Sequence, residues 1–172
     1  MSNVIATDVQ TQEINSALIE LFEITLPNGT TLYFHPGLDS DLTDVQFRDK
    51  TSPYTIRDYN PMPMMIDGLE LQADGASSRP AFTVANIGTL FQTELGDFKN
   101  DDLIGERLIR RQTLRKYLVG GAEDASPPIE FSSQEYIIDR IAEENSTSIT
   151  YEVATPFDLE NIQLPRRIVV GK

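Results

Sequence analysis

The sequence predicts a mainly β protein, an antiparallel β-barrel or sandwich with a short N-terminal helix and one short internal helix. Three observations favour this class: many short runs rich in β-branched and aromatic residues, turn signals of Gly, Pro, Asn and Asp between them, and a length of 172 residues. That length suffices for one domain with its own hydrophobic core. We expect an N-terminal helix or arm over 1–15, the β domain over 16–154, and a proline-containing segment with a final strand over 155–172.

The N-terminal part predicts a helix followed by a hairpin. Ile5 and Val9 share one helical face in an otherwise polar stretch, which predicts the short helix or arm. Two β-compatible runs, 17–26 and 30–34, then flank the dipeptide Asn28-Gly29. Because both residues tolerate a positive φ, the dipeptide predicts a type I′ turn and therefore a tight hairpin.

The middle of the chain predicts short strands and one helix. Turn residues and isolated aromatic residues over 35–60 indicate a loop with short strands. The strands expected next are 62–66, paired with 69–71 around Asp67-Gly68, and 81–87. Leu90, Phe91 and Leu95 stand at helical spacing, so 88–96 should form the internal helix.

The C-terminal part contains one ambiguous segment and a second hairpin. Residues 107–118 carry a cluster of basic residues, and their helical propensity opposes a strand-like context. After a loop over 120–128, apolar residues alternate over 136–144 and 148–154, which predicts two antiparallel strands joined at 144–147. The last apolar run, 168–170, predicts a final strand.

Composition and charge exclude several classes of function. Fourteen basic and 27 acidic residues give a formal net charge of −13, and there is one His and no Cys. Disulfides and thiolate metal sites are therefore impossible. An acidic chain also repels nucleic acid, whose binding rests on Lys and Arg, so we expect no stable nucleic-acid binding. No apolar run is long enough to cross a bilayer and no basic, apolar leader opens the chain, so we expect no membrane insertion and folding in a cytoplasm.

No residue pattern nominates a catalytic, cofactor or metal site. The single imidazole, His35, has no thiol to activate, and we expect an exposed or partly packed loop residue. The acidic segment 39–44 lacks the Gly and the final Glu of an EF-hand loop, and the segment from Gly68 to Gly75 lacks the spacing of a phosphate-binding loop. We therefore expect no enzyme, no cofactor and no metal, although 27 acids always allow some carboxylate pair of the glycosidase kind.

The basic cluster at 107–116 opposes the global charge. It lacks the interleaved aromatic residues on which bases stack in single-stranded nucleic-acid sites. We expect its arginines, Arg110 and Arg111 among them, to pair with acidic strands of the same chain or with an acidic neighbouring subunit, which would give orientation and register.

Residues 68–87, GLELQADGASSRPAFTVANI, resemble the minor tail protein L family of tailed bacteriophages. The most specific points are Ser78-Arg79-Pro80 and Val84-Ala85-Asn86. Three further stretches resemble the family in the same order: 18–26, 103–118 and 154–170. The resemblance implies strands at 107–118 and 136–144, and a tail-tip or baseplate-hub subunit that forms a ring, trimeric in the family.

The resemblance also implies partners, a location and a missing module. The partners would be other copies of the chain, the distal tail or tube protein, and the central hub, fibre or spike protein, at the tail end of a virion assembled in the host cytoplasm. Lambda-type members continue beyond the region matching 165–170 into a cysteine-containing extension that binds an iron–sulfur cluster. Because thiolates hold such clusters, we expect this chain to lack that module.

Ten residues follow as candidates for a structural motif or an interface. Arg79 is expected to be a buried or interfacial guanidinium, or to act within one subunit, through bidentate bonds. Three neighbours, Gly68, Gly75 and Pro80, are expected to set the turns around it. The full set is Gly68, Gly75, Ser78, Arg79, Pro80, Asn86, Arg110, Arg111, Pro165 and Arg167.

Three alternative functions stay open from the sequence. One is a hexameric distal-tail adaptor. Another is a carboxylate-based hydrolase of cell-envelope glycans, and the third is a receptor-binding module.

Overall fold

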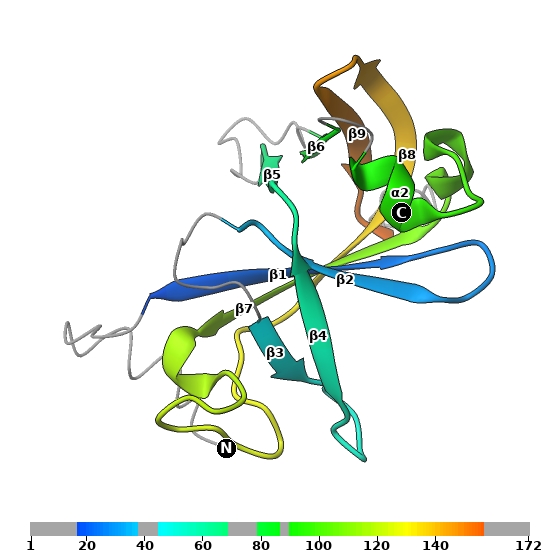
Figure 1. Ribbon diagram of the computed structural model, residues 1–172. Helices are drawn as coiled ribbons and strands as arrows, with labels where there is room; N and C mark the ends of the chain where they lie inside the picture. Colours follow the sequence, from blue (N-terminus) through cyan, green and yellow to red (C-terminus); the bar gives the residue numbers. More distant parts are fainter. Residues whose placement is uncertain (1–16, 38–44, 69–78, 87–89, 157–172) are drawn as a thin grey trace, which may run out of the picture.

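The structure, a computed structural model, describes residues 17–37, 45–68, 79–86 and 90–156. Nine strands form one mixed, open sheet in the order β3-β4-β2-β1-β7-β8-β9-β6-β5 (Figure 1). The strands are β1 (Leu18–Thr25), β2 (Thr31–His35), β3 (Val45–Arg48), β4 (Ile56–Pro61), β5 (Met64–Asp67), β6 (Ala81–Ala85), β7 (Arg107–Leu114), β8 (Gln134–Glu144) and β9 (Ser148–Ala154). The helical segments are α2 (Leu90–Leu95), η2 (Asn100–Leu103) and η3 (Arg115–Tyr117). The mainly β class is confirmed, but the sheet is not closed into a barrel.

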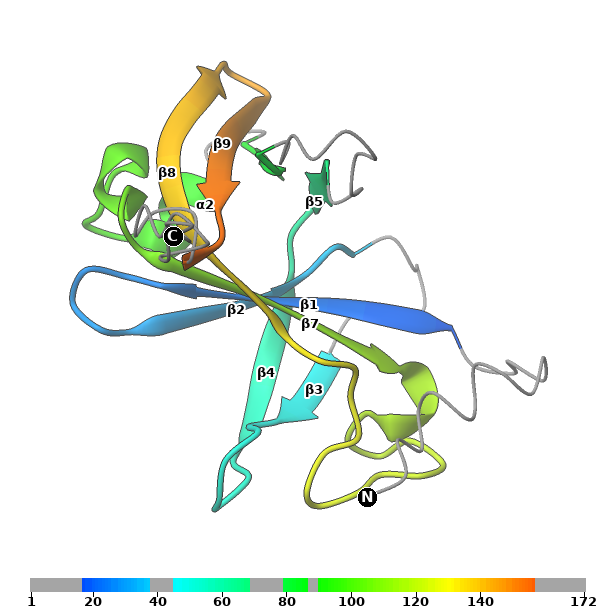
Figure 2. The same cartoon turned by 180° about the vertical axis from the view of Figure 1, so that it is seen from behind.

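Two lobes pack on opposite faces of a central ribbon. β1 pairs antiparallel with β7, and this ribbon crosses the middle of the molecule in both views (Figures 1 and 2). Successive side chains of a strand point to opposite faces. Phe22, Ile24 and Leu108 therefore enter a larger core with β5, β6, β8, β9 and α2, whereas Ile19 and Leu21 enter a smaller core with β3 and β4.

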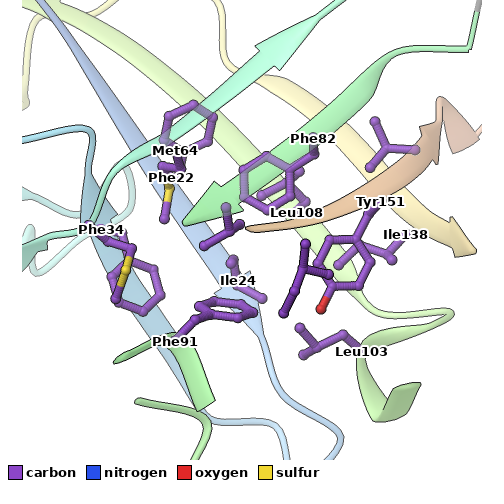
Figure 3. Packing of buried hydrophobic residues seen from close by; sticks show 14 of the residues in the cluster. Phe22, Ile24, Phe34, Met64, Phe82, Phe91, Leu103, Leu108, Ile138 and Tyr151 are labelled. Carbon is purple, nitrogen blue, oxygen red and sulfur yellow. The ribbon is translucent and has the colours of Figure 1, made fainter. Parts of the chain in front are cut away.

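Aromatic rings fill the larger core. The ring of Phe82 lies 5.6 Å from that of Phe22 and 6.3 Å from that of Tyr151, measured between centroids. Phe34 and Phe91 form a further pair with centroids 6.3 Å apart, and Figure 3 shows these rings directed into one shared interior. Such contacts add to the area that each ring removes from water. The larger core is thus a continuous aromatic cluster.

The predicted internal helix is confirmed as α2. Phe91 and Leu95 stand four residues apart and lie on one face of the helix, and both are buried in the larger core. The helix is short because Gly96, with φ +65, follows it immediately in the left-handed conformation that ends many helices.

The first predicted hairpin is confirmed, but its predicted turn type is wrong. β1 and β2 pair up to Thr25↔Thr31. Gly29 has φ +82 whereas Asn28 does not have a positive φ, and the carbonyl of Leu26 accepts the N–H of Gly29 at 2.8 Å. The reason is Pro27, whose ring fixes φ near the value required at the second position of a type I turn, so glycine follows the turn as a bulge.

The second predicted hairpin, β8–β9, is confirmed as well. The pairing runs from Ile137↔Ala154 to Glu144↔Ile149 and shifts register twice, which twists the ribbon more strongly. Asn145 closes the turn, since its Oδ1 accepts the N–H groups of Thr147 and Ser148 at 2.9 and 2.8 Å. The curvature of this ribbon is plain in Figure 1.

The ambiguous basic segment forms a strand. β7 spans Arg107–Leu114 and gives way to the single 3-10 turn η3. Its helical propensity is overridden because β1 and β8 pair with it on both edges. The short strands expected within 35–60 are confirmed as β3 and β4.

One further predicted strand has a described partner, and three predicted elements lie outside the described residues. β5 pairs with β6, from Met64↔Val84 to Asp67↔Ala81. The partner strand expected at 69–71, the N-terminal helix over 1–15 and the final strand at 168–170 lie outside the described residues.

Replacement of Phe82 should destabilise the fold strongly. Phe82 is fully buried between two other rings, so Phe82→Ala should lower the free energy of unfolding by about 3–5 kcal/mol. The matched control is Met65→Ala on the neighbouring strand, which changes a side chain that is half exposed and should stay within about 0.5 kcal/mol of the parent. Urea unfolding checks both values, and equal losses would contradict this account of the core.

Candidate functional site

A buried arginine joins the central ribbon to the smaller lobe. Arg111 of β7 is only 3% exposed. Its Nε donates to Glu130 Oε2 at 2.6 Å, and its Nη1 donates to Glu23 Oε1 at 3.0 Å and lies 3.3 Å from the Tyr59 hydroxyl. Its Nη2 donates to the carbonyl of Arg48 at 2.9 Å. One guanidinium thereby ties together β1, β3, β4, β7 and the segment that precedes β8.

The planar shape of this guanidinium allows a further contact. The Arg111 carbon Cζ lies 4.6 Å from the centroid of the Phe47 ring, on β3. A cation over an aromatic face is attracted by the electrons of the ring, and stacking also shields the arginine from water. The flat fork and the ring together explain why arginine, rather than lysine, occupies this position.

The electrostatics keep the network in one protonation state. Burial alone lowers the pKa of Arg111, but the Tyr59 oxygen and the neighbouring carboxylates outweigh burial and raise it, so the guanidinium stays charged. Burial and the charge of Glu23 raise the pKa of Tyr59, so its hydroxyl stays neutral and donates to Glu23 Oε1 at 2.7 Å. Lys50 Nζ lies 3.9 Å from Glu130 Oε1, so its positive charge partly neutralises the Glu130 carboxylate.

An open cleft of about 420 Å³ lies beside this network. Its floor is the face of the ribbon that carries Glu23, Ile109 and Arg111, and its wall is the turn between β3 and β4. Lys50, in that turn, donates to Ser133 Oγ at 3.2 Å and so connects the wall to the segment before β8.

The cleft contains equal numbers of acidic and basic side chains. Three acidic and three basic side chains line it: Glu23, Asp49, Glu135, Lys50, Arg107 and Arg111. The region around α2, η2 and the end of β8 is strongly acidic by contrast. Its charged residues are Glu94, Asp97, Lys99, Asp101, Asp102, Glu106, Glu143 and Glu144. The concave surface is thus locally neutral in a protein of net charge −13.

The basic strand finds partners within its own chain. Arg110 pairs with Glu20 of β1 and donates to Gln134 Oε1 at 2.7 Å, and Arg107 pairs with Glu135 of β8. Of the two sequence-based alternatives, the structure shows pairing with acidic strands of the same chain for these arginines and for Arg111.

Arg79 is exposed, so among the expected alternatives it is not a buried guanidinium, and it makes ion pairs within its own subunit. Its side chain is 56% exposed and pairs with Asp139 of β8, with Glu152 of β9 3.9 Å away. The next residue, Pro80, accepts the N–H of Val153 through its carbonyl at 3.0 Å. Arg79 thereby holds the start of β6 against the β8–β9 ribbon, and it does not line the cleft.

The other candidates are dispersed. Gly68 ends β5 with φ +77, and the N–H of Asn86 donates to the carbonyl of Thr147 at 2.8 Å. Four further candidates lie outside the described residues: Gly75, Ser78, Pro165 and Arg167. Of the six candidates within the described ranges, the structure places only Arg111 at the cleft.

Sequence reasoning missed the partners of Arg111. Glu23, Tyr59 and Glu130 come from three separate parts of the chain, and no local pattern joins them. The one available signal was Glu23, which with Glu20 is one of two charges within the apolar run 17–26. A charge in such a run requires a partner, but only the β1–β7 register identifies it.

His35 is buried, so the expectation of an exposed or partly packed loop residue is wrong. It ends β2 and is 3% exposed, because β4 crosses beside it and Met62 donates its N–H to the His35 carbonyl at 2.9 Å. Its Nδ1 accepts the N–H of Gly37 at 3.2 Å. Burial lowers the pKa of this imidazole, which favours the neutral ring.

The described part of the chain offers neither a metal cluster nor a helix that could span a membrane. It contains no group of three or more His, Asp or Glu side chains placed to hold a metal ion. The chain also has no cysteine, so none of its residues supplies the thiolates that an iron–sulfur cluster takes. No helix within the described ranges is long and apolar enough to span a membrane.

Comparison with known proteins assigns the chain to a family and identifies a relative in phage lambda. Residues 28–172 match the family described as phage minor tail protein L, and the chain belongs to this family of structural proteins of the bacteriophage virion tail. One relative is the tail tip protein L of Escherichia phage lambda, which is 28% identical over 169 residues. That alignment covers 94% of this chain and 68% of the lambda protein. The resemblance carried by residues 68–87 and the three other stretches is confirmed.

Removal of the buried guanidinium should destabilise the protein far more than removal of an exposed one. Arg111→Met leaves Glu23 and Glu130 without their main partner and should cost about 3–5 kcal/mol of unfolding free energy. Arg107→Met on the same strand removes an exposed pair and should cost less than about 1 kcal/mol. Urea unfolding measures both, and similar losses would refute the central role of Arg111.

The only histidine should make stability depend on pH. The pKa of His35 is lower in the folded protein than in the unfolded chain. The stability that its neutral ring contributes is therefore present above the unfolded pKa of about 6.5, and it is lost as the pH falls through the folded pKa. The free energy of unfolding should therefore fall between about pH 7.5 and about pH 5.5 more for the parent than for His35→Asn. The asparagine Oδ1 can still accept the N–H of Gly37 but does not titrate. Parallel pH slopes in the two proteins would contradict this prediction.

Proposed function

We propose that the chain is a structural subunit of the tail tip or baseplate hub. In this proposal it forms a ring, trimeric as the family resemblance implies, between the distal tail tube and the central fibre or spike. The observation that carries the proposal is the match of residues 28–172 to the minor tail protein L family together with the tail-tip name of the lambda relative. The name of the relative supports the tail-tip location, whereas the ring and its partners are proposed from the family resemblance alone.

The geometry supports a role in assembly. Subunits of a ring contact each other through two different surfaces, one on each side. The two lobes lie on opposite faces of one ribbon and present different surfaces, one acidic around α2 and η2 and one charge-balanced at the cleft. The acidic surface of several copies would give a negative potential, which lets DNA pass without binding.

We also propose how the chain is divided in the assembly. Residues 16–154 form the hub domain, while the arm over 1–15 and the segment over 155–172 reach neighbouring subunits. Among the dispersed candidates, Arg79 at the start of β6 is the exposed position best placed for a contact between subunits, because more than half of its side chain faces solvent.

Catalysis has weaker support than assembly. The buried carboxylates beside the cleft, Glu23 and Glu130, are held by Arg111, and Glu23 also accepts from Tyr59. An acid or base of a glycan hydrolase must be free to exchange a proton with substrate. Glu23 and Glu130 are therefore better explained as structural groups.

Purified tails test the proposal directly. We expect the chain at the distal end of the tail in a reconstruction at side-chain resolution, and quantitative mass spectrometry should count copies consistent with a trimer. Six copies would favour the distal-tail adaptor instead. Absence of the chain from the tail end would refute the hub role, as would lytic activity lost on replacing one Asp or Glu, or binding of the isolated protein to host cells.

A further inference from the structure

The charge-balanced cleft restricts what can occupy it. Its acidic side chains would repel an anion, and its basic side chains would repel a cation. The acidic ones are Glu23, Asp49 and Glu135, and the exposed basic ones are Lys50 and Arg107. Each of these acids already has a basic partner on the same chain, so a charged occupant would have to displace an existing ion pair. The favoured occupant carries hydrogen-bonding groups and no charge.

The lining also disfavours lipids and sugars. Ile109 is the one apolar residue among those that line the cleft, and no aromatic ring lines it. Apolar ligands need an apolar wall, and sugar rings commonly need an aromatic platform. Thr51 and Ser133 add hydroxyl groups at the rim, so the lining suits a short polar peptide segment.

The same chain presents such a segment at the turn of the β1–β2 hairpin. Residues 27–30, Pro-Asn-Gly-Thr, are all exposed and uncharged. In both views this turn lies at the outer margin of the molecule, beyond the strands that pack on β1 (Figures 1 and 2). The turn is a projection that a neighbour can reach.

The turn is also held in one conformation. Asn28 Oδ1 accepts the N–H of Thr30 at 2.8 Å, and the N–H of Leu26 donates to the Thr30 carbonyl at 2.7 Å. A segment that is already ordered loses less conformational entropy on binding. A second projecting turn, between β8 and β9, is flanked by Glu143 and Glu144 and so carries charge toward any acidic neighbour.

We propose that the β1–β2 turn of one copy docks in the cleft of a second copy, an inference that rests on the ring of the proposed function. Copies with a net charge of −13 repel each other, so contact costs least where an uncharged projection meets a locally neutral surface. The turn and the cleft are different surfaces of one chain. Their contact is therefore heterologous, which is the kind that closes a ring.

The absence of cysteine from the chain makes a selective cross-linking test possible. Thr30→Cys places a thiol on the turn and Thr51→Cys places one on the cleft rim, and both parent side chains are exposed. Tails assembled with the double variant are purified and treated with a short bismaleimide. We expect covalently linked dimers and higher multiples of the chain, roughly a hundredfold above the control, because assembly holds the two thiols at high effective concentration.

The matched control moves the first thiol from the β1–β2 turn to the β8–β9 turn. Ser146→Cys with Thr51→Cys has the same number of thiols and an equally exposed position, and it should stay monomeric. A second pair, T30C with S133C, places the cleft thiol on another lining residue. It provides the test if the protein with T51C fails to fold.

The outcomes separate this inference from the proposed function. If immunoblots find the chain in tails but neither T30C pair links copies above the control, docking of the turn is refuted while the hub role stands. A cross-link to a protein of different mass would also refute a second copy as the occupant. If the parent chain is absent from tails, both the hub role and the docking contact fall.

Discussion

Arg111 is the interaction on which the arrangement of the two lobes depends. The ribbon of β1 and β7 offers one face to each lobe. Within the described residues, β3 and β4 join the sheet through only two parallel residue pairs, Phe34↔Asn60 and His35↔Pro61. The guanidinium strengthens this narrow junction by holding a carbonyl of β3 and side chains of β1, β4 and the segment before β8. A buried charge of this kind is weak support for stability itself, yet strong support for a unique geometry, because unpairing it is costly.

The distribution of charge follows from that arrangement. Most basic side chains of the described ranges form ion pairs within the subunit, for example Arg48 with Asp124 and Arg140 with Glu152. The excess of acidic residues is therefore left on the surface around α2 and η2. A surface with this acidic excess repels other copies of the chain over most of its area, which restricts where an assembly contact can form.

Local signals predicted the local elements. Asn28-Gly29 marked the first hairpin, the alternation around Glu144–Thr147 marked the second, and the spacing of Phe91 and Leu95 marked α2, because each of these patterns acts over a few residues. The predicted turn type was wrong because the fixed φ of Pro27 favours a type I turn over the type I′ turn that Asn28-Gly29 indicates. The site could not be predicted, because Glu23, Tyr59 and Glu130 meet Arg111 only after distant strands have paired.

The sequence alone determined the mainly β class, the acidic balance, the absence of cysteine chemistry and the family, since composition, alternation and short motifs carry these properties directly. Tertiary structure alone decided that His35 is buried and that Arg111 and a neutral cleft share one face of the ribbon. The physical reason is that burial and ion pairing depend on which distant residues become neighbours. Sheet register sets those neighbours, and a shift by one residue would turn Arg111 to the opposite face.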